Sequence, residues 1–283
     1  MPRILIAGCG YVGSRTADLF HEGGWAVEGW THSAVSSAQL LRKPYPVIPL
    51  DIARRDQINA RPENFDIIIH CASTQGGDAE QYRQVYLDGS RNLLDRFVGS
   101  TFLFTSSTSV YGQDDGEWVT EQSPAQPRHD TGRVLFEAEQ LVLSRGGIVL
   151  RLAGIHGPKR SGLLKKFLNG QAIIDKDNDR FANQVHRDDV ASALFLLADS
   201  RREPAQVYNV VDDAPIRRSE CYLWLAEKLN RPAPPVGQSP VNPKRGRSNK
   251  RVRNDKLRGV GWVPQYPSFA DAMERSILPS FGL

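Results

Sequence analysis

The fold is decided by the stretch Ile4-Leu5-Ile6-Ala7-Gly8-Cys9-Gly10-Tyr11-Val12-Gly13, near the start of the 283-residue chain. Its apolar run predicts a buried strand, and the glycine turn leads into a segment with helical periodicity to about residue 22. Gly8 permits a tight turn, Gly10 lets a ligand approach the backbone, and Gly13 lets helix and strand pack closely. Free N–H groups at a helix start attract anions, so the stretch predicts a pyrophosphate site. We expect contacts to a dinucleotide from Gly8, Gly10, Tyr11, Val12 and Gly13. A plain strand-turn-helix glycine cluster is the alternative.

Apolar strand candidates alternate with helix-length segments through the first half of the chain. The strands are expected at 4–7, 25–30, 47–50, 66–70, 101–105 and 147–152, and the helices at 12–22, 33–42, 78–98 and 131–145. This alternation predicts an α/β fold: a Rossmann-type doubly wound parallel sheet over residues 1–155, with helices on both faces. The alternation weakens after residue 152. We expect a smaller irregular C-terminal substrate lobe over 156–283, with a loop at 230–247 and a chain that can cross between the lobes.

Composition excludes several classes of protein. With 40% hydrophobic and 24% charged residues, and no apolar run of membrane-spanning length, the chain is expected to be globular and not membrane-bound. Its three cysteines are too sparse for a disulfide framework, and the N-terminus lacks a signal-peptide core, so a cytoplasmic location is expected. The histidines are scattered, which predicts no metal site.

Positive charge is concentrated in one segment. Residues 244–258 carry eight Lys or Arg against the single Asp255, whereas the whole chain has a net charge of +4. A solvated basic face is the preferred interpretation. A clamp for a diphosphate or carboxylate substrate is an alternative, because arginine binds such groups bidentately. Nucleic-acid binding ranks low because the segment shows no interleaved aromatic series.

The end of the second strand bears on the choice of cofactor. An acid there would bind the adenosine ribose of NAD, but the strand ends Gly29-Trp30-Thr31-His32-Ser33. The missing acid removes a repulsion, and Thr31, His32 and Ser33 are expected to donate to a 2′-phosphate. The sequence therefore favours NADP, with NAD as the alternative. Cys9 is interpreted as a small residue tolerated between glycines, with a reactive thiol as the alternative.

Further motifs occur in order along the chain. They are Leu50-Asp51, His70-Cys71-Ala72-Ser73, Asp88-Gly89-Ser90-Arg91-Asn92-Leu93-Leu94, Ser106-Ser107-Thr108-Ser109-Val110-Tyr111-Gly112, Arg151-Leu152-Ala153-Gly154-Ile155-His156-Gly157-Pro158 and Val185-His186-Arg187-Asp188-Asp189-Val190. With the glycine turn, they resemble an extended short-chain dehydrogenase/reductase of the NAD-dependent epimerase/dehydratase type, over nearly the whole chain.

The resemblance implies roles for several residues. Asp51 is expected to contact the adenine, and Ser107 to bind a substrate oxygen. The cofactor cleft is expected to be lined also by Ile52, Cys71 and Ala72. Helix capping by Asp51 and ordinary turn chemistry at Ser107 are the alternatives.

The chain departs from the family at its chemical centre. Such enzymes use Tyr-x-x-x-Lys as acid/base and its helper, but alignment through Glu139 places Thr131 and Leu135 there. A threonine hydroxyl is too weak an acid, and leucine supplies no charge. Tyr86 stands at the position where the long helix of the family usually carries an asparagine.

Substitutes for the missing pair are Tyr111 and Tyr86, with Arg133 as a cation that favours a phenolate. Packing is the preferred interpretation of Tyr111, although we name it with Ser107 as a catalytic candidate. His156 and His186 are further acid/base candidates, with structural roles preferred.

The altered active-site pattern, together with the motifs Asn249-Lys250-Arg251-Val252-Arg253-Asn254, Gly261-Trp262 and Tyr266-Pro267-Ser268, resembles an atypical subgroup of the family, the nucleoside-diphosphate-sugar epimerases. It implies an NAD(P)-dependent oxidoreductase or epimerase/dehydratase that acts on a small polar substrate such as a nucleotide sugar, without the usual Tyr-x-x-x-Lys pair. A non-catalytic NAD(P) sensor is the alternative, and a homodimer is compatible with the sequence.

Overall fold

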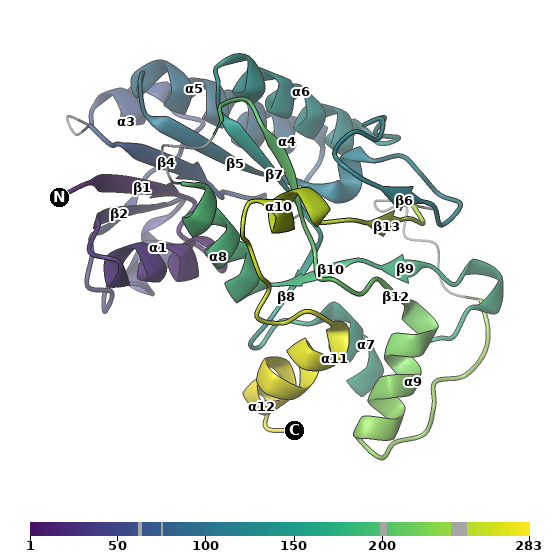
Figure 1. Ribbon diagram of the computed structural model, residues 1–283. Coiled ribbons are helices and arrows are strands. Elements are labelled where there is room, and N and C mark those ends of the chain that lie inside the picture. Colours follow the sequence, from purple (N-terminus) through teal and green to yellow (C-terminus); the bar gives the residue numbers. More distant parts are fainter. Residues whose placement is uncertain (62–63, 75, 199–202, 239–247) are drawn as a thin grey trace. The chain divides into compact units, whose positions relative to one another are not determined.

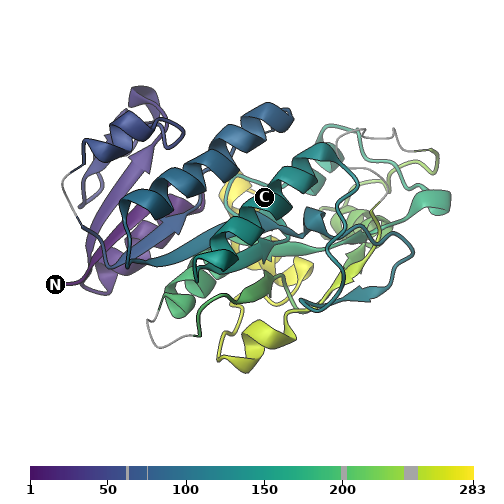
Figure 2. The same ribbon diagram turned by 90° about the horizontal axis from the view of Figure 1, so that it is seen from above.

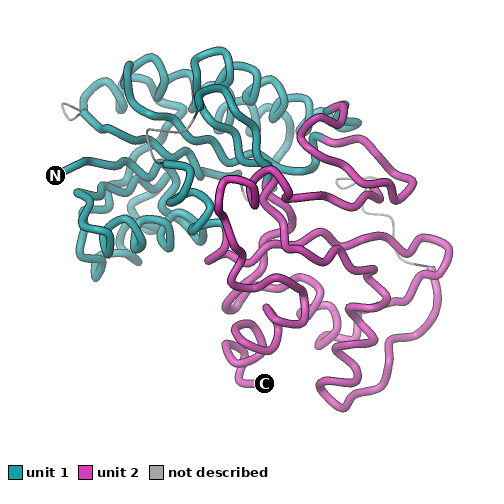
Figure 3. The backbone as a smooth tube through the Cα atoms, viewed as in Figure 1, with its two compact units in different colours: residues 1–110, 125–151, 190–208 teal, residues 111–124, 152–189, 209–283 magenta. Residues whose placement is uncertain are grey.

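The computed structural model describes residues 1–61, 64–74, 76–198, 203–238 and 248–283. Contacts divide the chain into two compact units, which Figure 3 colours separately. Unit 1 comprises residues 1–110, 125–151 and 190–208, and unit 2 comprises 111–124, 152–189 and 209–283. The chain therefore passes between the units several times. The division expected at residue 155 stays a prediction.

A seven-stranded parallel sheet forms the centre of the fold, in the order β11-β7-β5-β4-β1-β2-β3. Its strands are β1 (Arg3–Ala7), β2 (Ala26–Thr31), β3 (Val47–Pro49), β4 (Ile67–His70), β5 (Thr101–Ser107), β7 (Ile148–Leu152) and β11 (Val207–Val210). All residues of β4 and β7 are buried, which is typical of strands covered on both faces. The doubly wound parallel sheet predicted from the sequence is confirmed.

The helices of unit 1 lie on both faces of the sheet, with α1 opposite α3, α5 and α6 (Figures 1 and 2). They are α1 (Gly13–Glu22), α2 (Ala34–Ala38), α3 (Arg55–Asn59), α4 (Ala79–Tyr82), a π-helical turn (Arg83–Asp88), α5 (Gly89–Arg96), a 3₁₀ turn (Thr108–Val110) and α6 (Asp130–Ser144). Helix α8 (Arg187–Leu197) belongs to both units. The expected helix at 78–98 is thus interrupted by a π turn.

Unit 2 is built from two-stranded sheets and short helices. Its strand pairs are β8 (Gly154–His156) with β10 (Gln184–His186), β9 (Phe181–Ala182) with β12 (Ile216–Arg217), and β6 (Trp118–Val119) with β13 (Arg251–Val252). Its helical elements are α7 (Gly162–Leu168), a 3₁₀ turn (Lys176–Asn178), α9 (Arg218–Lys228), α10 (Asp255–Gly259), α11 (Phe269–Ala272), a π turn (Met273–Ile277) and α12 (Leu278–Phe281).

Apolar side chains of α7, α9 and α11, among them Leu164, Leu225 and Phe269, form one core of unit 2. This irregular architecture agrees with the smaller lobe expected from the sequence. Residues 239–247 of the expected loop at 230–247 lie outside the described residues. No helix in the described part of the chain is long and apolar enough to span a membrane.

Candidate cofactor and active site

The direction of chain progression reverses between β1 and β4, which are neighbours in the sheet. Ala7 at the end of β1 pairs with His70 at the end of β4. In open parallel sheets ligands bind beyond the carboxyl ends of the strands at such a reversal. The glycine turn begins directly after β1, so the sheet places it at this position.

The three glycines of the turn have different surroundings. Gly8 has a φ of 100°, and a Cβ there would lie 2.1 Å from the Ala72 nitrogen. A Cβ on Gly13 would lie 2.2 Å from the Gly8 oxygen, so both positions require glycine for the packing of the protein itself. At Gly10, by contrast, a Cβ would meet no protein atom within 4 Å. The space beside Gly10 is therefore open among the residues that the structure describes, and a ligand contact there stays a prediction.

The start of α1 can accept negative charge. Its first turn contains no acidic residue, and Val12 at the N-cap makes no side-chain capping bond. Tyr11 and Val12 lie at this helix start, which is half-exposed at both residues. The turn therefore fits the pyrophosphate of a dinucleotide, which would be held by backbone N–H groups and the helix dipole.

Cys9 is a structural residue of the turn. Its side chain is fully buried, and a Cβ on Gly29 of β2 would lie only 2.8 Å from its sulfur. Burial raises the pKa of the Cys9 thiol to about 12, so the alternative of a reactive thiol is wrong. Its amide donates to the Trp30 carbonyl at 2.7 Å, which ties the turn to β2.

The three polar residues at the end of β2, Thr31, His32 and Ser33, differ in how free their side chains are to bind a ligand. Thr31 is buried and donates to the Ser33 carbonyl, and the Ser33 hydroxyl caps α2 by accepting from Ser36 N–H. His32 is 80% exposed at its side chain, and its Nδ1 lies 3.7 Å from Oδ1 of Asp51. The end of β2 itself carries no acid. Asp51, which follows β3, nevertheless lies beside it, because β2 and β3 are parallel neighbours.

Asp51 and Ile52 are held by hydrogen bonds within their own turn and from α5. Asp51 Oδ1 accepts from Ala53 N–H at 3.0 Å, which forms a turn, while the N-cap of α3 is Arg54. The alternative of Asp51 as a helix cap is therefore wrong. Asn92 of α5 donates to the carbonyls of Ile52 and Ala53 at 3.1 and 3.2 Å. Asp51 is thus held on a braced turn, and its contact with adenine stays a prediction.

Cys71 and Ala72 follow β4 beneath the glycine turn. Cys71 N–H donates to the Ala7 carbonyl at 2.8 Å, and the backbone of both residues faces Gly8. Burial raises the pKa of the Cys71 thiol, which disfavours the thiolate form that a nucleophile needs. Their expected role in lining the cofactor cleft depends on this backbone.

Ser107 ends β5 and is half-buried, and its hydroxyl accepts from Ser109 N–H at 3.1 Å. Ser106, one residue earlier, donates at 2.6 Å to Glu139 of α6. Glu139 also binds Arg151 of β7, and both partners are buried. This network fixes the end of β5 against α6. The turn bond leaves the Ser107 hydroxyl hydrogen available to a substrate oxygen, and that role stays a prediction.

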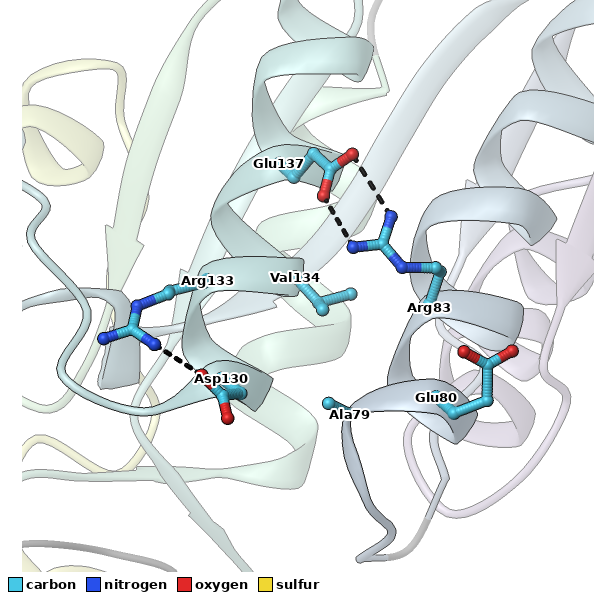
Figure 4. Close-up of a pocket in the computed structure, with 7 residues that line it drawn as sticks. All are labelled: Ala79, Glu80, Arg83, Asp130, Arg133, Val134 and Glu137. Atoms are coloured by element: carbon cyan, nitrogen blue, oxygen red, sulfur yellow. Dashed lines mark hydrogen bonds and ion pairs between the residues drawn. The ribbon is translucent and has the colours of Figure 1, made fainter.

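Helix α6 is the element that the alignment predicts to correspond to the tyrosine–lysine helix of the family. Thr131 lies half-buried in its first turn, and Leu135 is buried. Arg133, the expected helper cation, is 63% exposed and pairs with Asp130 (Figure 4). In the same view Arg83 forms a two-pronged ion pair with Glu137, at 3.3 and 3.1 Å.

Those charged side chains line a shallow pocket between α4 and α6. Among the predicted residues only Arg133 lines it, so this pocket is not the expected active site.

The two candidate tyrosines lie in different units. Tyr111 of unit 2 is 1% exposed, and its hydroxyl donates to Asn209 at 2.9 Å. This geometry favours the packing interpretation, and a chemical role for Tyr111 stays a prediction. Tyr86 of unit 1 lies in the π turn and stacks on His70, with ring centroids 6.3 Å apart. Burial raises the pKa of Tyr86, whereas Thr74 and Ser73 beside its phenol lower it.

The two histidines of unit 2 are buried and neutral. Burial lowers the pKa of His156 to about 3 and that of His186 to about 4. His186 accepts from Asp188 N–H through Nδ1 and contacts Ser276 through Nε2. Its structural interpretation is thereby favoured, because the bond orders the start of α8.

The basic segment is only in part the solvated face expected from the sequence, because Arg253 and Arg258 are exposed whereas Lys250 is buried. Residues 244–247 lie outside the described residues, but Lys250 is 5% exposed and donates to the Tyr111 carbonyl at 3.0 Å. Arg251 lies between Trp118 and Phe181, 4.8 and 5.1 Å from the ring centroids. Arg253 also lies over the Trp118 ring, 4.5 Å from its centroid.

Arg217 lies over Phe181 at 4.6 Å and extends this series. We call Arg217, Phe181, Arg251, Trp118 and Arg253 the arginine–aromatic ladder. The ladder was not predicted from the sequence, because its members come from β6, β9, β12, β13 and the residue after β13. Only the pairing of these strands brings them together. No group of three or more potential metal ligands occurs among residues that the structure describes.

A glycine turn between β1 and α1, at the reversal point of a parallel sheet, defines a Rossmann-type dinucleotide-binding protein. The model of the NAD dependent epimerase/dehydratase family matches residues 4–210, and the chain belongs to this family. The resemblance inferred from the motifs is therefore confirmed.

Three similar proteins illustrate the range of the family. Protein YeeZ of Escherichia coli K12 is 28% identical, over 94% of this chain and 97% of that protein. A structure from Methylobacillus flagellatus, assigned to the NAD-dependent epimerases/dehydratases, is also 28% identical, with a TM-score of 0.81 over 100% of this chain and 99% of that one. UDP-glucose 4-epimerase from Thermotoga maritima, solved with UDP-glucose, has a TM-score of 0.85 at 18% identity, over 99% and 98% of the two chains. This last likeness shows the fold alone.

Proposed function

We propose that this chain is an NAD(P)-dependent enzyme of the oxidoreductase or epimerase/dehydratase kind, acting on a small polar substrate that carries phosphate, such as a nucleotide sugar. One observation supports cofactor binding. Protein atoms fill the space where a Cβ would stand at Gly8 and Gly13, whereas the space beside Gly10 is open, at the reversal point of the sheet. The bound nicotinamide would supply the oxidation and reduction of a carbon centre.

The proposed substrate class is supported by the arginine–aromatic ladder. Arg251 donates through Nε to the Gly116 carbonyl at 2.8 Å, and rings on both sides restrict its guanidinium. A restricted guanidinium loses little conformational entropy when it binds phosphate. The UDP-glucose in the similar Thermotoga epimerase is consistent with a diphosphate ligand of this kind.

The proposed chemistry uses residues of unit 1. Ser107 donates a hydrogen bond to a substrate oxygen, and Tyr86 is preferred to Tyr111 as the proton-transfer group. The Tyr86 phenol lies beside the loop after β4 and, like any phenol, is protonated at neutral pH. Burial raises its pKa and so opposes its action as an acid, whereas the hydrogen bonds with Thr74 and Ser73 lower the pKa and favour it. In this proposal no lysine assists the phenol, because Leu135 stands at the position that the alignment assigns to it.

The proposal that NADP binds at least as well as NAD rests on His32. Thr31 and Ser33 are engaged in bonds of their own, whereas the exposed His32 imidazole can face a 2′-phosphate. The nearby Asp51 carboxylate opposes this preference. A clear preference for NADH would therefore overturn the NADP proposal while leaving the cofactor site intact.

The cofactor is tested by titrating protein fluorescence with NADPH and NADH at fixed salt. Gly10→Ala is expected to weaken binding at least tenfold at unchanged stability, because its methyl group enters space that only a ligand needs. Gly162→Ala is the matched control, since a Cβ there also meets nothing within 4 Å. Equal affinity of wild type and Gly10→Ala would contradict the proposed site.

Activity is tested by screening nucleotide sugars, aldehydes and ketones, with nicotinamide absorbance and product analysis as readouts. Loss of turnover in Ser107→Ala, with cofactor affinity unchanged, supports the enzyme. Cofactor binding without turnover favours the second candidate function, a non-catalytic sensor, to which Thr131 and Leu135 point.

A further inference from the structure

The long helix that ends with α5 changes its hydrogen-bond register at the π turn Arg83–Asp88. In an α-helix Gly89 N–H would bond the Val85 carbonyl, four residues earlier. Here it bonds the Gln84 carbonyl, five residues earlier. The Val85 carbonyl therefore loses its usual helical donor, and a buried carbonyl without a donor is costly.

His70 supplies the replacement donor. Its Nε2 lies 3.0 Å from the Val85 oxygen, and a carbonyl only accepts, so Nε2 carries the hydrogen. The imidazole is completely buried, and its Nδ1 has no hydrogen-bond partner among the residues that the structure describes. Burial lowers the pKa of His70 to about 4, which keeps this neutral form at physiological pH.

The position of His70 links the helix to the cofactor turn. It is the last residue of β4, opposite Ala7, and its own carbonyl accepts from the Thr105 hydroxyl at 3.1 Å. Gly89 permits the approach of the helix, because a Cβ there would lie 2.8 Å from the Ile52 side chain and 3.5 Å from His70 Nε2.

The π turn in turn sets the place of Tyr86. The Tyr86 ring is nearly parallel to the His70 imidazole, with an interplanar angle of 10°, and packs edge-on to Phe104. Arg83, in the same turn, is joined to Glu137 of α6 (Figure 4). The turn is therefore held from β4 on one side and from α6 on the other.

We infer that His70 is a positioning residue: its Nε2–H holds the Val85 carbonyl and thereby fixes the π turn that presents Tyr86 beside the loop after β4. The role of Tyr86 rests on the proposed function, whereas the bond itself does not. His70 therefore contributes the N–H donor to the Val85 carbonyl and not only an aromatic ring.

Two variants separate donor from ring in the full-length protein. His70→Phe keeps an aromatic ring and removes the N–H, and His70→Gln keeps an N–H and removes the ring. Hydrogen exchange is followed by mass spectrometry in peptides covering residues 83–90 and, as an internal control, residues 138–144 of α6. Dissociation constants for NADPH and NADH are measured on the same samples.

In His70→Phe we expect exchange in 83–90 to rise at least tenfold while 138–144 is unchanged, and nucleotide binding to weaken about tenfold. His70→Gln should restore both to within threefold of wild type. The inference is overturned if His70→Phe behaves as wild type, if His70→Gln is equally impaired, or if exchange rises evenly in both peptides.

Gly89→Ala provides an independent variant if His70→Phe does not fold. Its methyl group presses on Ile52 and His70, so exchange in 83–90 should rise, with Gly162→Ala as control, and an unchanged rate counts against the inference. If wild type binds neither nucleotide, the proposed function fails, while the exchange comparison still decides the role of His70.

Discussion

Thr131 stands at the position where the alignment predicts the catalytic tyrosine of the family. If the protein turns over a substrate in the screen above, Thr131→Val should retain activity within about twofold, because its hydroxyl cannot titrate near neutrality. Tyr86→Phe should lower turnover by about 10²-fold or more at unchanged cofactor affinity, the usual contribution of a positioned acid. Steady-state kinetics beside nucleotide titration measures both. A hundredfold loss in Thr131→Val would show that the assignment of the acid is wrong.

Tyr111→Phe is the control for a tyrosine that packs. It loses the bond to Asn209, so the free energy of unfolding should fall by about 1 kcal/mol while turnover is maintained. A large loss of turnover at unchanged stability would instead restore Tyr111 as the chemical candidate.

Asp212 of unit 2 is a carboxyl group in an unfavourable setting. It is 2% exposed, and neither oxygen has a well-formed hydrogen bond among the residues that the structure describes. Burial raises its pKa well above the ordinary value, Asp213 and Asp189 raise it further, and the Ala214 amide opposes them. The folded protein therefore retains this proton at a pH where the unfolded chain has lost it.

The raised pKa of Asp212 makes stability depend on pH. As pH rises above about 4, the ordinary carboxyl range, the unfolded state ionises first and the folded state loses relative stability. Asp212→Asn should therefore be more stable than wild type by about 1–3 kcal/mol at pH 8, with the difference vanishing towards pH 4. Urea denaturation at both pH values measures this.

Asp213→Asn is the neighbouring control for Asp212. Asp213 accepts from Asn254 at 2.8 Å and pairs with Arg258 at 3.5 Å, so no gain in stability is expected. A destabilised Asp212→Asn at pH 8 would mean that the carboxylate has a favourable partner in the folded protein.

At the scale of elements, a buried ion pair joins α6 to the sheet. Arg151 of β7 meets Glu139 at 2.6 Å, and Ser106 of β5 donates to the same carboxylate. Arg151→Met should lower the free energy of unfolding by about 3–5 kcal/mol, because it leaves the Glu139 charge buried and unpaired. Urea denaturation measures the loss.

Removing all three members of this network should lower the free energy of unfolding less than removing Arg151 alone. In Arg151→Met/Glu139→Leu/Ser106→Ala, no buried charge remains, so most of the lost stability should return. A triple variant no more stable than Arg151→Met would show that packing, rather than the unpaired charge, explains the loss.

Elements were predicted from the sequence where the signal was local. The buried strands and α1 follow from apolar runs and the glycine turn, and α6 begins within one residue of the expected start. The break in the expected helix at 78–98 was missed, because the donor to the Val85 carbonyl is His70, fifteen residues earlier in the sequence. A long-range bond of this kind leaves no periodic signal.

At the scale of the whole molecule, the two units carry different predicted ligand contacts. The glycine turn, Asp51 and Ala72 belong to unit 1, whereas the arginine–aromatic ladder belongs entirely to unit 2. NADPH should therefore slow hydrogen exchange in peptides covering residues 8–16 and 71–74, and UDP-glucose should slow it in peptides covering 116–119 and 251–253.

Arg251→Ala is the variant that separates the two ligands. It should abolish the protection by UDP-glucose and leave that by NADPH unchanged, since Arg251 is restricted between Trp118 and Phe181. Loss of both protections together would indicate general destabilisation of unit 2. Protection by UDP-glucose that persists in the variant would exclude the ladder as its site.

The sequence by itself determined the family, the parallel sheet and the position of the cofactor turn. These depend on residues that are close along the chain: an apolar strand, a glycine turn and a helix start, whose geometry is imposed by local sterics. The predicted absence of the tyrosine–lysine pair also rests on local sequence, because both positions, Thr131 and Leu135, lie on one helix.

Only the tertiary structure decided which side chains meet across strands. It placed Asp51 beside His32, where the sequence had shown no acid. It also packed Arg251 and Arg253 of the basic segment over the ring of Trp118, which comes from a distant part of the chain. It also engaged the Tyr111 hydroxyl with Asn209, ninety-eight residues away, and left Tyr86 stacked on His70. These outcomes depend on strand pairing and burial between distant segments, and neither leaves a trace in the local pattern of residues.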